Sequence, residues 1–275
     1  LRYLFLIFFI SLAFFLIIPN FFNYEKKKQI IRDYLSINYG LELKKNDKIK
    51  FNSFPLPNLE INNLEFNLFL KDNNLTTKKL IIYPKFISIY NYDNFRIKKI
   101  KLIDSDMVTN FQNIKNLTSR IFQLQNKIYF DDLDIKIKNF EDTIILLKNI
   151  DFSNYGYKKN LVQGEIFRQN FKIKVHKNFK KINFKLSNTG ISSELILSDN
   201  NFPSSIGDLK VKLLNSNLKI NFNYHNNEFK INRAFFRSKN LSFDSDGFIL
   251  FKPFFKIDLN SKIKNLNFNL LNKIN

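Results

Sequence analysis

The chain has 275 residues, a formal net charge of +20 and no cysteine. Without cysteine it can form neither a disulfide nor a thiolate metal site, and its length suffices for one large or two small domains. The charge indicates either a phosphate-rich partner, such as anionic lipid, or only a lysine-rich composition. Because no basic helix, zinc spacing or RNA motif is present, we expect no nucleic-acid partner.

Residues 1–22 begin with an apolar run in which Arg2 is the only charged residue. About 20 such residues span the hydrocarbon core of a bilayer as a helix, so we predict a transmembrane anchor. A cleaved signal peptide and a buried core helix are the alternatives, but the run ends without a small-x-small cleavage site. Lys26, Lys27 and Lys28 follow it, which by the positive-inside rule alone would place the bulk in the cytoplasm. The residues expected to face lipid are Leu4, Phe8, Leu12, Phe15 and Ile18.

Residues 23–40 predict a short amphipathic stalk helix at the membrane surface. Ile30, Ile31, Tyr34 and Leu35 recur at helical spacing on one face. Gly40 stands where a helix stop is expected.

From residue 41 the hydrophobic period changes to two, which is typical of strands with one apolar face. We predict a first β module over 41–108, a helical connection over 109–127, and a second β module over 128–275 that continues the same sheet. The doubled polar pair Asn62-Asn63 shifts the apolar positions by one, as a β-bulge does.

The predicted fold is therefore mainly β, with a long curled antiparallel sheet and few helices. No helical crossover between strands is expected, which favours antiparallel pairing. Such a sheet can fold into a sandwich, close as a barrel, or curl around something apolar. Periodicity leaves open whether its apolar side chains are packed core or the lining of a trough.

Catalytic chemistry is weakly represented in the sequence. His176 and His225 have no second metal-type ligand nearby. Asp-Ser-Asp occurs at Asp104–Asp106 and at Asp244–Asp246; such pairs can hold a divalent metal in an enzyme of envelope sugars, but we interpret both as turn residues. We therefore expect no enzyme, no metal and no cofactor.

The layout of the chain resembles the AsmA family of bacterial envelope proteins. The resemblance is carried by the order of an apolar helix, a helix ending in Tyr39-Gly40, the Pro-rich segment Phe54–Phe66 and the later segment Leu241–Leu259. It implies an inner-membrane protein with its bulk in the periplasm, against the charge signal at 26–28. It also implies an apolar β-groove, similar to chorein-type bridge proteins, and a role in phospholipid transport between membranes and in outer-membrane assembly.

The resulting hypothesis is a groove that shelters acyl chains while headgroups stay in water, with phospholipid and the membrane as partners and envelope protein partners undefined. The alternative is a membrane-anchored structural or assembly scaffold with a closed β-sandwich and no lipid path. The groove-lining candidates are Ile61, Leu64, Phe66, Leu68, Ile135, Ile137, Ile173, Ile220, Phe222, Ile257 and Leu259.

Overall fold

A computed structural model describes residues 2–45, 48–69, 73–90, 95–139, 141–176, 179–199, 204–251 and 254–267. Strands make up 60% of the described residues and form a mixed sheet that does not close, accompanied by an N-terminal apolar helix and a few further helices. The predicted mainly β fold is thus confirmed, and the closed β-sandwich is wrong. The chain separates into two compact units, unit 1 (Leu1–Phe167) and unit 2 (Arg168–Asn275). Their boundary falls inside the predicted second module.

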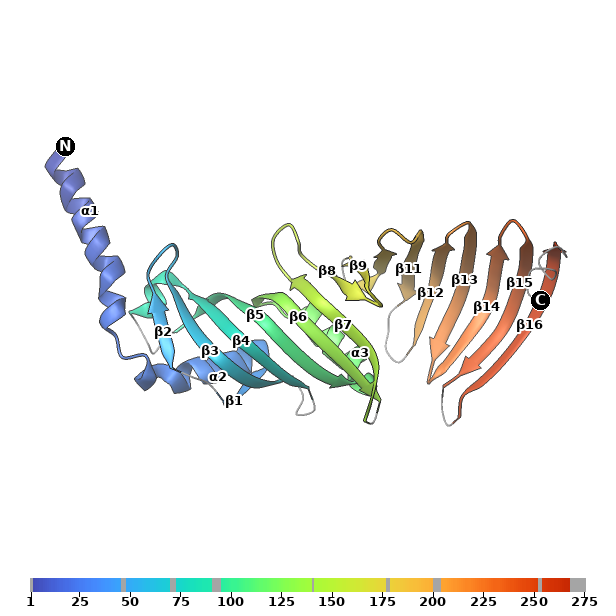
Figure 1. The fold of residues 1–275 in the computed structure, drawn as a ribbon, viewed down its shortest axis with the longest axis horizontal. Coiled ribbons are helices and arrows are strands. Elements are labelled where there is room, and N and C mark those ends of the chain that lie inside the picture. Colours follow the sequence, from blue (N-terminus) through green and yellow to red (C-terminus); the bar gives the residue numbers. More distant parts are fainter. Residues whose placement is uncertain are drawn as a thin grey trace. The chain divides into compact units, whose positions relative to one another are not determined.

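Unit 1 begins with the apolar helix and an amphipathic helix (Figure 1). Gly40 ends the second helix in the left-handed conformation at φ 66°, and its N–H donates to the carbonyl oxygen of Ser36. Glycine adopts this conformation without steric cost, so the expected helix stop is confirmed. The helical elements are α1 (Arg2–Ile17), η1 (Ile18–Phe21), η2 (Glu25–Lys27) and α2 (Lys28–Tyr39).

The sheet of unit 1 is ordered β1-β3-β4-β5-β6-β7-β8, with β2 paired to β3. Short helical segments connect some of these strands. In chain order the elements are β1 (Leu41–Lys45), β2 (Ile49–Asn52), β3 (Asn58–Leu68), β4 (Asn74–Pro84), η3 (Phe86–Ile89), β5 (Ile97–Asn110), η4 (Phe111–Asn113), α3 (Ile114–Gln123), β6 (Lys127–Asn139), β7 (Asp142–Ser153) and β8 (Leu161–Ile166).

One strand pair corrects the expectation of a purely antiparallel sheet. Strands β5 and β6 pair in parallel, with Lys99 opposite Lys127 and Asn110 opposite Lys138. The helix expected over 109–127 is present as α3, but it also carries the chain back to the end of the sheet where β5 began. A helical crossover of this kind joins parallel neighbours, so the prediction that no crossover exists was wrong.

Several strands of unit 1 change phase at matching positions. In β3 the buried residues are Leu59 and Ile61 before Asn62-Asn63, and Leu64 and Phe66 after it. The predicted phase shift is therefore confirmed. Left-handed residues lie at comparable points of β3, β5, β6 and β7, so apolar side chains stay on one face along these strands. These residues are Asn63 (φ 50°), Asp104 (φ 55°), Asp132 (φ 61°) and Asn149 (φ 50°).

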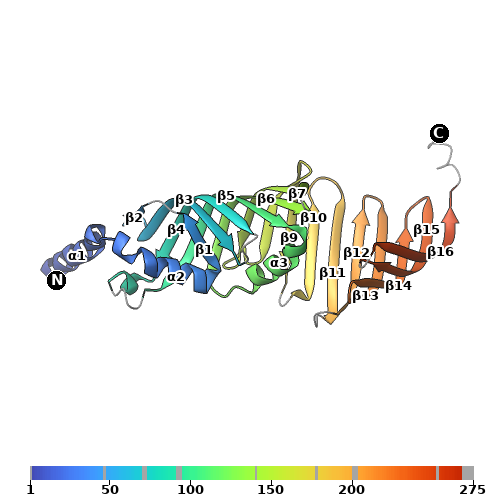
Figure 2. The ribbon, with the colours of Figure 1, turned by 90° about the horizontal axis from the view of Figure 1, so that it is seen from below.

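The core of unit 1 lies between this face of the sheet and the two helices α2 and α3, which cross it (Figure 2). From α2, Ile31, Leu35 and Tyr39 are buried, and Leu117 is buried from α3. The ring of Phe122 near the end of α3 meets that of Phe152 in β7 edge to face, with centroids 5.1 Å apart. The amphipathic helix predicted as a stalk therefore packs on the sheet of its own unit.

Unit 2 is a meander of eight antiparallel strands, each paired with the next along the chain. Its described residues contain no α-helix. Where the connection is fully described, short turns join the strands; between β13 and β14, Asn226 and Asn227 both have positive φ, as a tight hairpin turn requires. The strands are β9 (Gln169–Val175), β10 (Lys181–Leu186), β11 (Ile191–Asp199), β12 (Ser205–Leu213), β13 (Ser216–His225), β14 (Glu228–Arg237), β15 (Leu241–Leu250) and β16 (Lys256–Leu266).

Candidate functional site

The pairing of unit 2 places nearly all its apolar strand residues on one side of the sheet, which we name the apolar face. Residues directly opposite in an antiparallel pair point to the same side. Leu209, for example, pairs with Leu195 of β11 and with Ile220 of β13. The apolar face comprises Phe171, Ile173, Val175, Ile182, Phe184, Leu186, Ile191, Leu195, Leu197, Leu209, Val211, Leu213, Leu218, Ile220, Phe222, Phe229, Ile231, Phe236, Phe243, Ile249, Ile257, Leu259 and Ile263.

No described helix or second sheet of unit 2 covers the apolar face, so its side chains shelter only one another. Most are half-buried, and some of the more buried ones belong to stacked ring pairs, such as Phe222 with Phe229, 4.7 Å between centroids. On β16 the side chains of Ile257 and Ile263 are 53% and 59% exposed. Contiguous apolar surface of this extent is rare on soluble proteins and marks a binding surface for apolar partners.

The opposite side of the same sheet is mostly polar, and some of its charges form ion pairs there. Glu194 accepts hydrogen bonds from Lys181 and Lys210, which hold the pKa of its carboxyl below the usual range. Asp244 is held in the same way by Lys264 and Arg237, so its pKa is also lowered. The sheet is thus two-sided, and nothing charged has to enter the apolar side.

The groove candidates divide between the two units. In unit 1, Ile61, Leu64, Phe66 and Leu68 are at most 2% exposed. They form packed core beneath the helices and leave no surface for a ligand.

Two further candidates of unit 1 lie on the same side of β6. Ile137 is buried there and Ile135 is half-buried. The five candidates of unit 2 share the apolar face: Ile173, Ile220, Phe222, Ile257 and Leu259. Contact with lipid stays a prediction for these five and for the half-buried Ile135.

Sequence reasoning missed other members of the apolar face, such as Leu209, Phe236 and Ile249. The period-two alternation that revealed Ile220 is equally present around Leu209, where Lys210 and Lys212 separate apolar residues. Register with neighbouring strands is what joins these residues to one surface, and register is not readable from a single strand.

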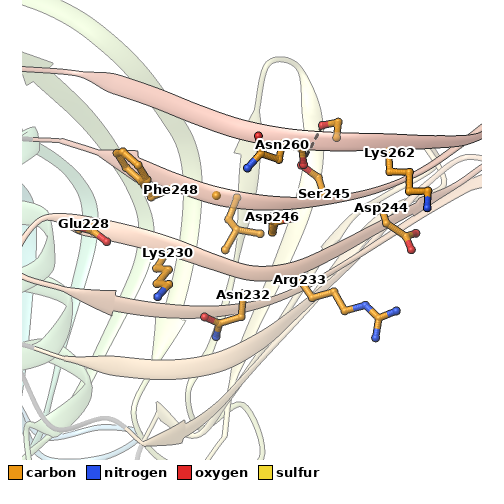
Figure 3. A pocket seen from close by; sticks show the side chains of 13 residues that line it. Glu228, Lys230, Asn232, Arg233, Asp244, Ser245, Asp246, Phe248, Asn260 and Lys262 are labelled. Carbon is orange, nitrogen blue, oxygen red and sulfur yellow. Dashed lines mark hydrogen bonds between the residues drawn. The ribbon is translucent and has the colours of Figure 1, made fainter.

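The two Asp-Ser-Asp segments lie inside strands β5 and β15, so their interpretation as turns was wrong. Asp104 forms an ion pair with Lys78 of the neighbouring strand. Asp244 and Asp246 line an open cleft of about 900 Å³ on β14, β15 and β16, whose side chains are shown in Figure 3. Among the described residues, no group of three or more His, Cys, Asp or Glu side chains is arranged to hold a metal ion.

The segment Arg2–Phe21 is 20 residues long with a mean hydropathy of 2.5, long and apolar enough to cross a membrane. Only 6% of it is buried, which argues against a core helix; a signal sequence would have the same properties. Phe15 stacks on Tyr90 of unit 1, with ring centroids 4.5 Å apart. The other four predicted lipid-facing residues, Leu4, Phe8, Leu12 and Ile18, are exposed.

Comparison with protein families, with curated proteins and with solved structures found no match. The resemblance to the AsmA family therefore stays a prediction, and the case for function depends on the geometry described above.

Proposed function

We propose that this chain is a membrane-anchored lipid-binding protein whose apolar face in unit 2 carries phospholipid acyl chains. The uncovered, contiguous apolar face is the observation that carries this proposal. In the bacterial envelope that its AsmA-like layout suggests, the protein is held in the inner membrane by residues 1–22, with its bulk in the periplasm. There it takes part in phospholipid transport between membranes and in outer-membrane assembly.

The energetics of the apolar face favour this use. An acyl chain in water costs about 0.8 kcal/mol for each exposed CH₂ group. Laying the chain along half-buried residues such as Leu209 and Ile220 removes apolar surface of both partners from water. The phosphate headgroup can remain hydrated, so no charge has to be desolvated.

Lipid transport of this kind needs no catalytic residue, because lipid movement along such a surface makes and breaks only non-covalent contacts. Each small step exchanges one set of apolar contacts for an equivalent set, so no single position has to bind tightly. Net direction must then come from a lipid gradient or from an energised partner. The side chains of the apolar face act by size and hydrophobicity rather than by specific chemistry.

The direct test is to measure phospholipid bound to the full chain after purification in mild detergent. Ile220→Asp places a carboxylate in the middle of the apolar face and should remove most of the bound phospholipid. Ile206 provides a matched control because it pairs with Asn223 on the polar side and is 41% exposed. Ile206→Asp should leave bound phospholipid unchanged, and Ile220→Phe should retain it.

Circular dichroism separates loss of binding from loss of folding in these variants. A folded wild-type chain without phospholipid, or equal retention by Ile220→Asp and Ile206→Asp, would contradict the proposal. Loss in Ile220→Asp alone, with the strand signal preserved, would support it.

A further inference from the structure

A cleft of about 330 Å³ in unit 1 lies outside the apolar face and has a different chemistry. Its walls include Leu56 and Pro57 from the loop between β2 and β3, and the rings of Tyr83 and Tyr155. Pro84, Lys98, Lys99 and Lys127 complete the lining. None of its described lining residues is acidic, so the cleft combines an apolar rim with three ammonium groups.

The strand register forces these ammonium groups together. Tyr83 of β4 lies opposite Lys99 of β5, and Lys99 lies opposite Lys127 of the parallel strand β6. Like charges directly opposite each other in a sheet are destabilising. Burial, together with repulsion from neighbouring lysines such as Lys98 and Lys127, lowers the pKa of Lys99.

Within the described part of the chain, no carboxylate forms an ion pair with any of these three lysines. Their recorded partners are aromatic: the Lys99 ammonium lies 4.3 Å from the centroid of the Tyr83 ring, and that of Lys127 lies 6.0 Å from the Tyr155 ring. Elsewhere on the same sheet, Lys78, Lys79 and Lys101 do have acidic partners. Among the described residues of unit 1, the cleft therefore brings together three lysines that have no acidic ion-pair partner.

The cleft lies at the end of the sheet that contacts the apolar helix. Beyond β4 the chain enters η3, whose following residue Tyr90 donates a hydrogen bond to the carbonyl oxygen of Phe15. The loop that supplies Leu56 follows β2, where Phe51 stacks on Tyr24. Beside the cleft, Phe54 is 86% exposed and Ile87 in η3 is 78% exposed, as expected for side chains that enter a membrane interface.

We propose that this cleft binds the phosphate headgroup of an anionic membrane phospholipid, with Lys98, Lys99 and Lys127 as its ligands. The apolar rim admits the first part of the acyl chains, and the exposed residues Phe54 and Ile87 hold the cleft at the bilayer surface. This inference rests on the membrane attachment proposed above, but not on lipid binding by the apolar face of unit 2. It gives the protein a headgroup preference that a purely apolar surface lacks.

The test reconstitutes the full chain into vesicles of equal parts phosphatidylglycerol and phosphatidylcholine, extracts it in mild detergent, and determines both bound lipids by mass spectrometry. The wild-type chain should be enriched in phosphatidylglycerol. The triple variant Lys98→Gln, Lys99→Gln, Lys127→Gln should lose this enrichment, by about fivefold or more, since one lysine near a membrane surface contributes about that factor. The triple Lys→Arg variant should retain it.

A matched control removes the same charge from the polar side of unit 2, by Lys172→Gln, Lys185→Gln, Lys212→Gln. Enrichment that survives in the cleft variant, or falls equally in the control, would overturn the proposal. Binding of inorganic phosphate to the chain without any phosphatidylglycerol enrichment would identify free phosphate as the ligand and overturn the lipid assignment. Total bound lipid reports separately on the apolar face, so failure of one proposal is distinguishable from failure of the other.

Discussion

The sheets of unit 1 and unit 2 share one sequence pattern, but their apolar side chains are buried to different extents. Apolar residues alternate with polar ones in both, and register gathers them on one side in both. In unit 1 the side chain of Ile61 is 1% exposed, whereas in unit 2 Ile220 is half-buried and no described helix of that unit covers it. The comparison teaches that period-two alternation identifies the apolar side of a sheet but says nothing about its cover.

The cover in unit 1 comes from two amphipathic helices whose apolar stripes match the sheet. Leu35 of α2 is completely buried and Leu117 of α3 nearly so. In unit 2 the connections that are fully described are tight turns, which leave no residues for a helix. The difference in cover therefore follows from connection length: the sheet of unit 1 is covered by helices, and the described part of the sheet of unit 2 is not.

The largest effect should follow from breaking the cover of unit 1. Leu35→Asp would bury an unpaired carboxylate under α2, so we expect the free energy of unfolding to fall by more than about 3 kcal/mol, measured by urea denaturation. Ile30 on the same helix is 38% exposed, and Ile30→Asp should cost less than about 1 kcal/mol. Equal losses for the two variants would mean that α2 is not packed as described.

A matched pair of isoleucines compares the two sheets directly. Ile61→Ala removes a packed core side chain and should cost about 2–5 kcal/mol, because a cavity remains. Ile220→Ala trims a half-buried side chain without leaving a closed cavity, and should cost about 1 kcal/mol or less. Urea unfolding of both variants measures the two losses of stability. A larger loss for Ile220→Ala than for Ile61→Ala would contradict the assignment of core and open face.

Part of this architecture was predictable from local patterns. The shift at Asn62-Asn63 appeared as two adjacent polar residues, and Gly40 marked the end of α2 because a left-handed residue was needed there. Three residues of the apolar face, Ile173, Ile220 and Phe222, were among the candidates that the alternation indicated. These features depend on residues close in sequence, which is why a single chain reveals them.

The rest depends on pairing between distant segments. The helix over 109–127 was foreseen, but its consequence, the parallel pair of β5 and β6, depends on where the chain returns. The lysine cleft could not be predicted from the sequence for the same reason, because Lys99 and Lys127 become neighbours only through that parallel register. Assignment of Leu64 and Phe66 to a groove overlooked the helices that cover them.

A smaller effect on stability is expected at Asp132, one of the left-handed residues that are aligned across the strands of unit 1. Burial and the neighbouring carboxylates of Asp104 and Asp134 raise the pKa of Asp132 above its ordinary value of 3.8, so its ionisation is less favourable in the folded state. This penalty is present above the folded pKa and disappears as pH falls below 3.8. Asp132→Asn removes the charge and keeps a residue that tolerates φ 61°.

We therefore expect Asp132→Asn to stabilise unit 1 by about 0.5 kcal/mol at neutral pH. The gain should vanish in acid, where the wild-type carboxyl is also neutral. Thermal unfolding at both pH values measures it, with Asp142→Asn as a control away from this group. A gain that persists in acid would show that repulsion is not its cause.

The smallest expected effect is a difference in pH dependence between the lysine cleft of unit 1 and the surface lysines of unit 2. Because the pKa of Lys99 is lowered, rising pH should remove its proton before it removes those of ordinary lysines. Enrichment in phosphatidylglycerol should therefore decline at a lower pH than that at which ordinary lysines lose their protons, while the Lys→Arg triple variant keeps it. A parallel decline in both proteins would contradict a role for the Lys99 proton.

The most direct measurement is photo-crosslinking of the full chain in vesicles that contain a phospholipid with a photoactivatable group on its acyl chain. Crosslinked peptides identified by mass spectrometry should come from the apolar face, with adducts on residues such as Leu209, Ile220 and Ile249. The covered residues Ile61 and Phe66 should carry none. Adducts confined to residues 1–22, or placed on unit 1 core residues and absent from unit 2, would contradict a lipid-carrying face.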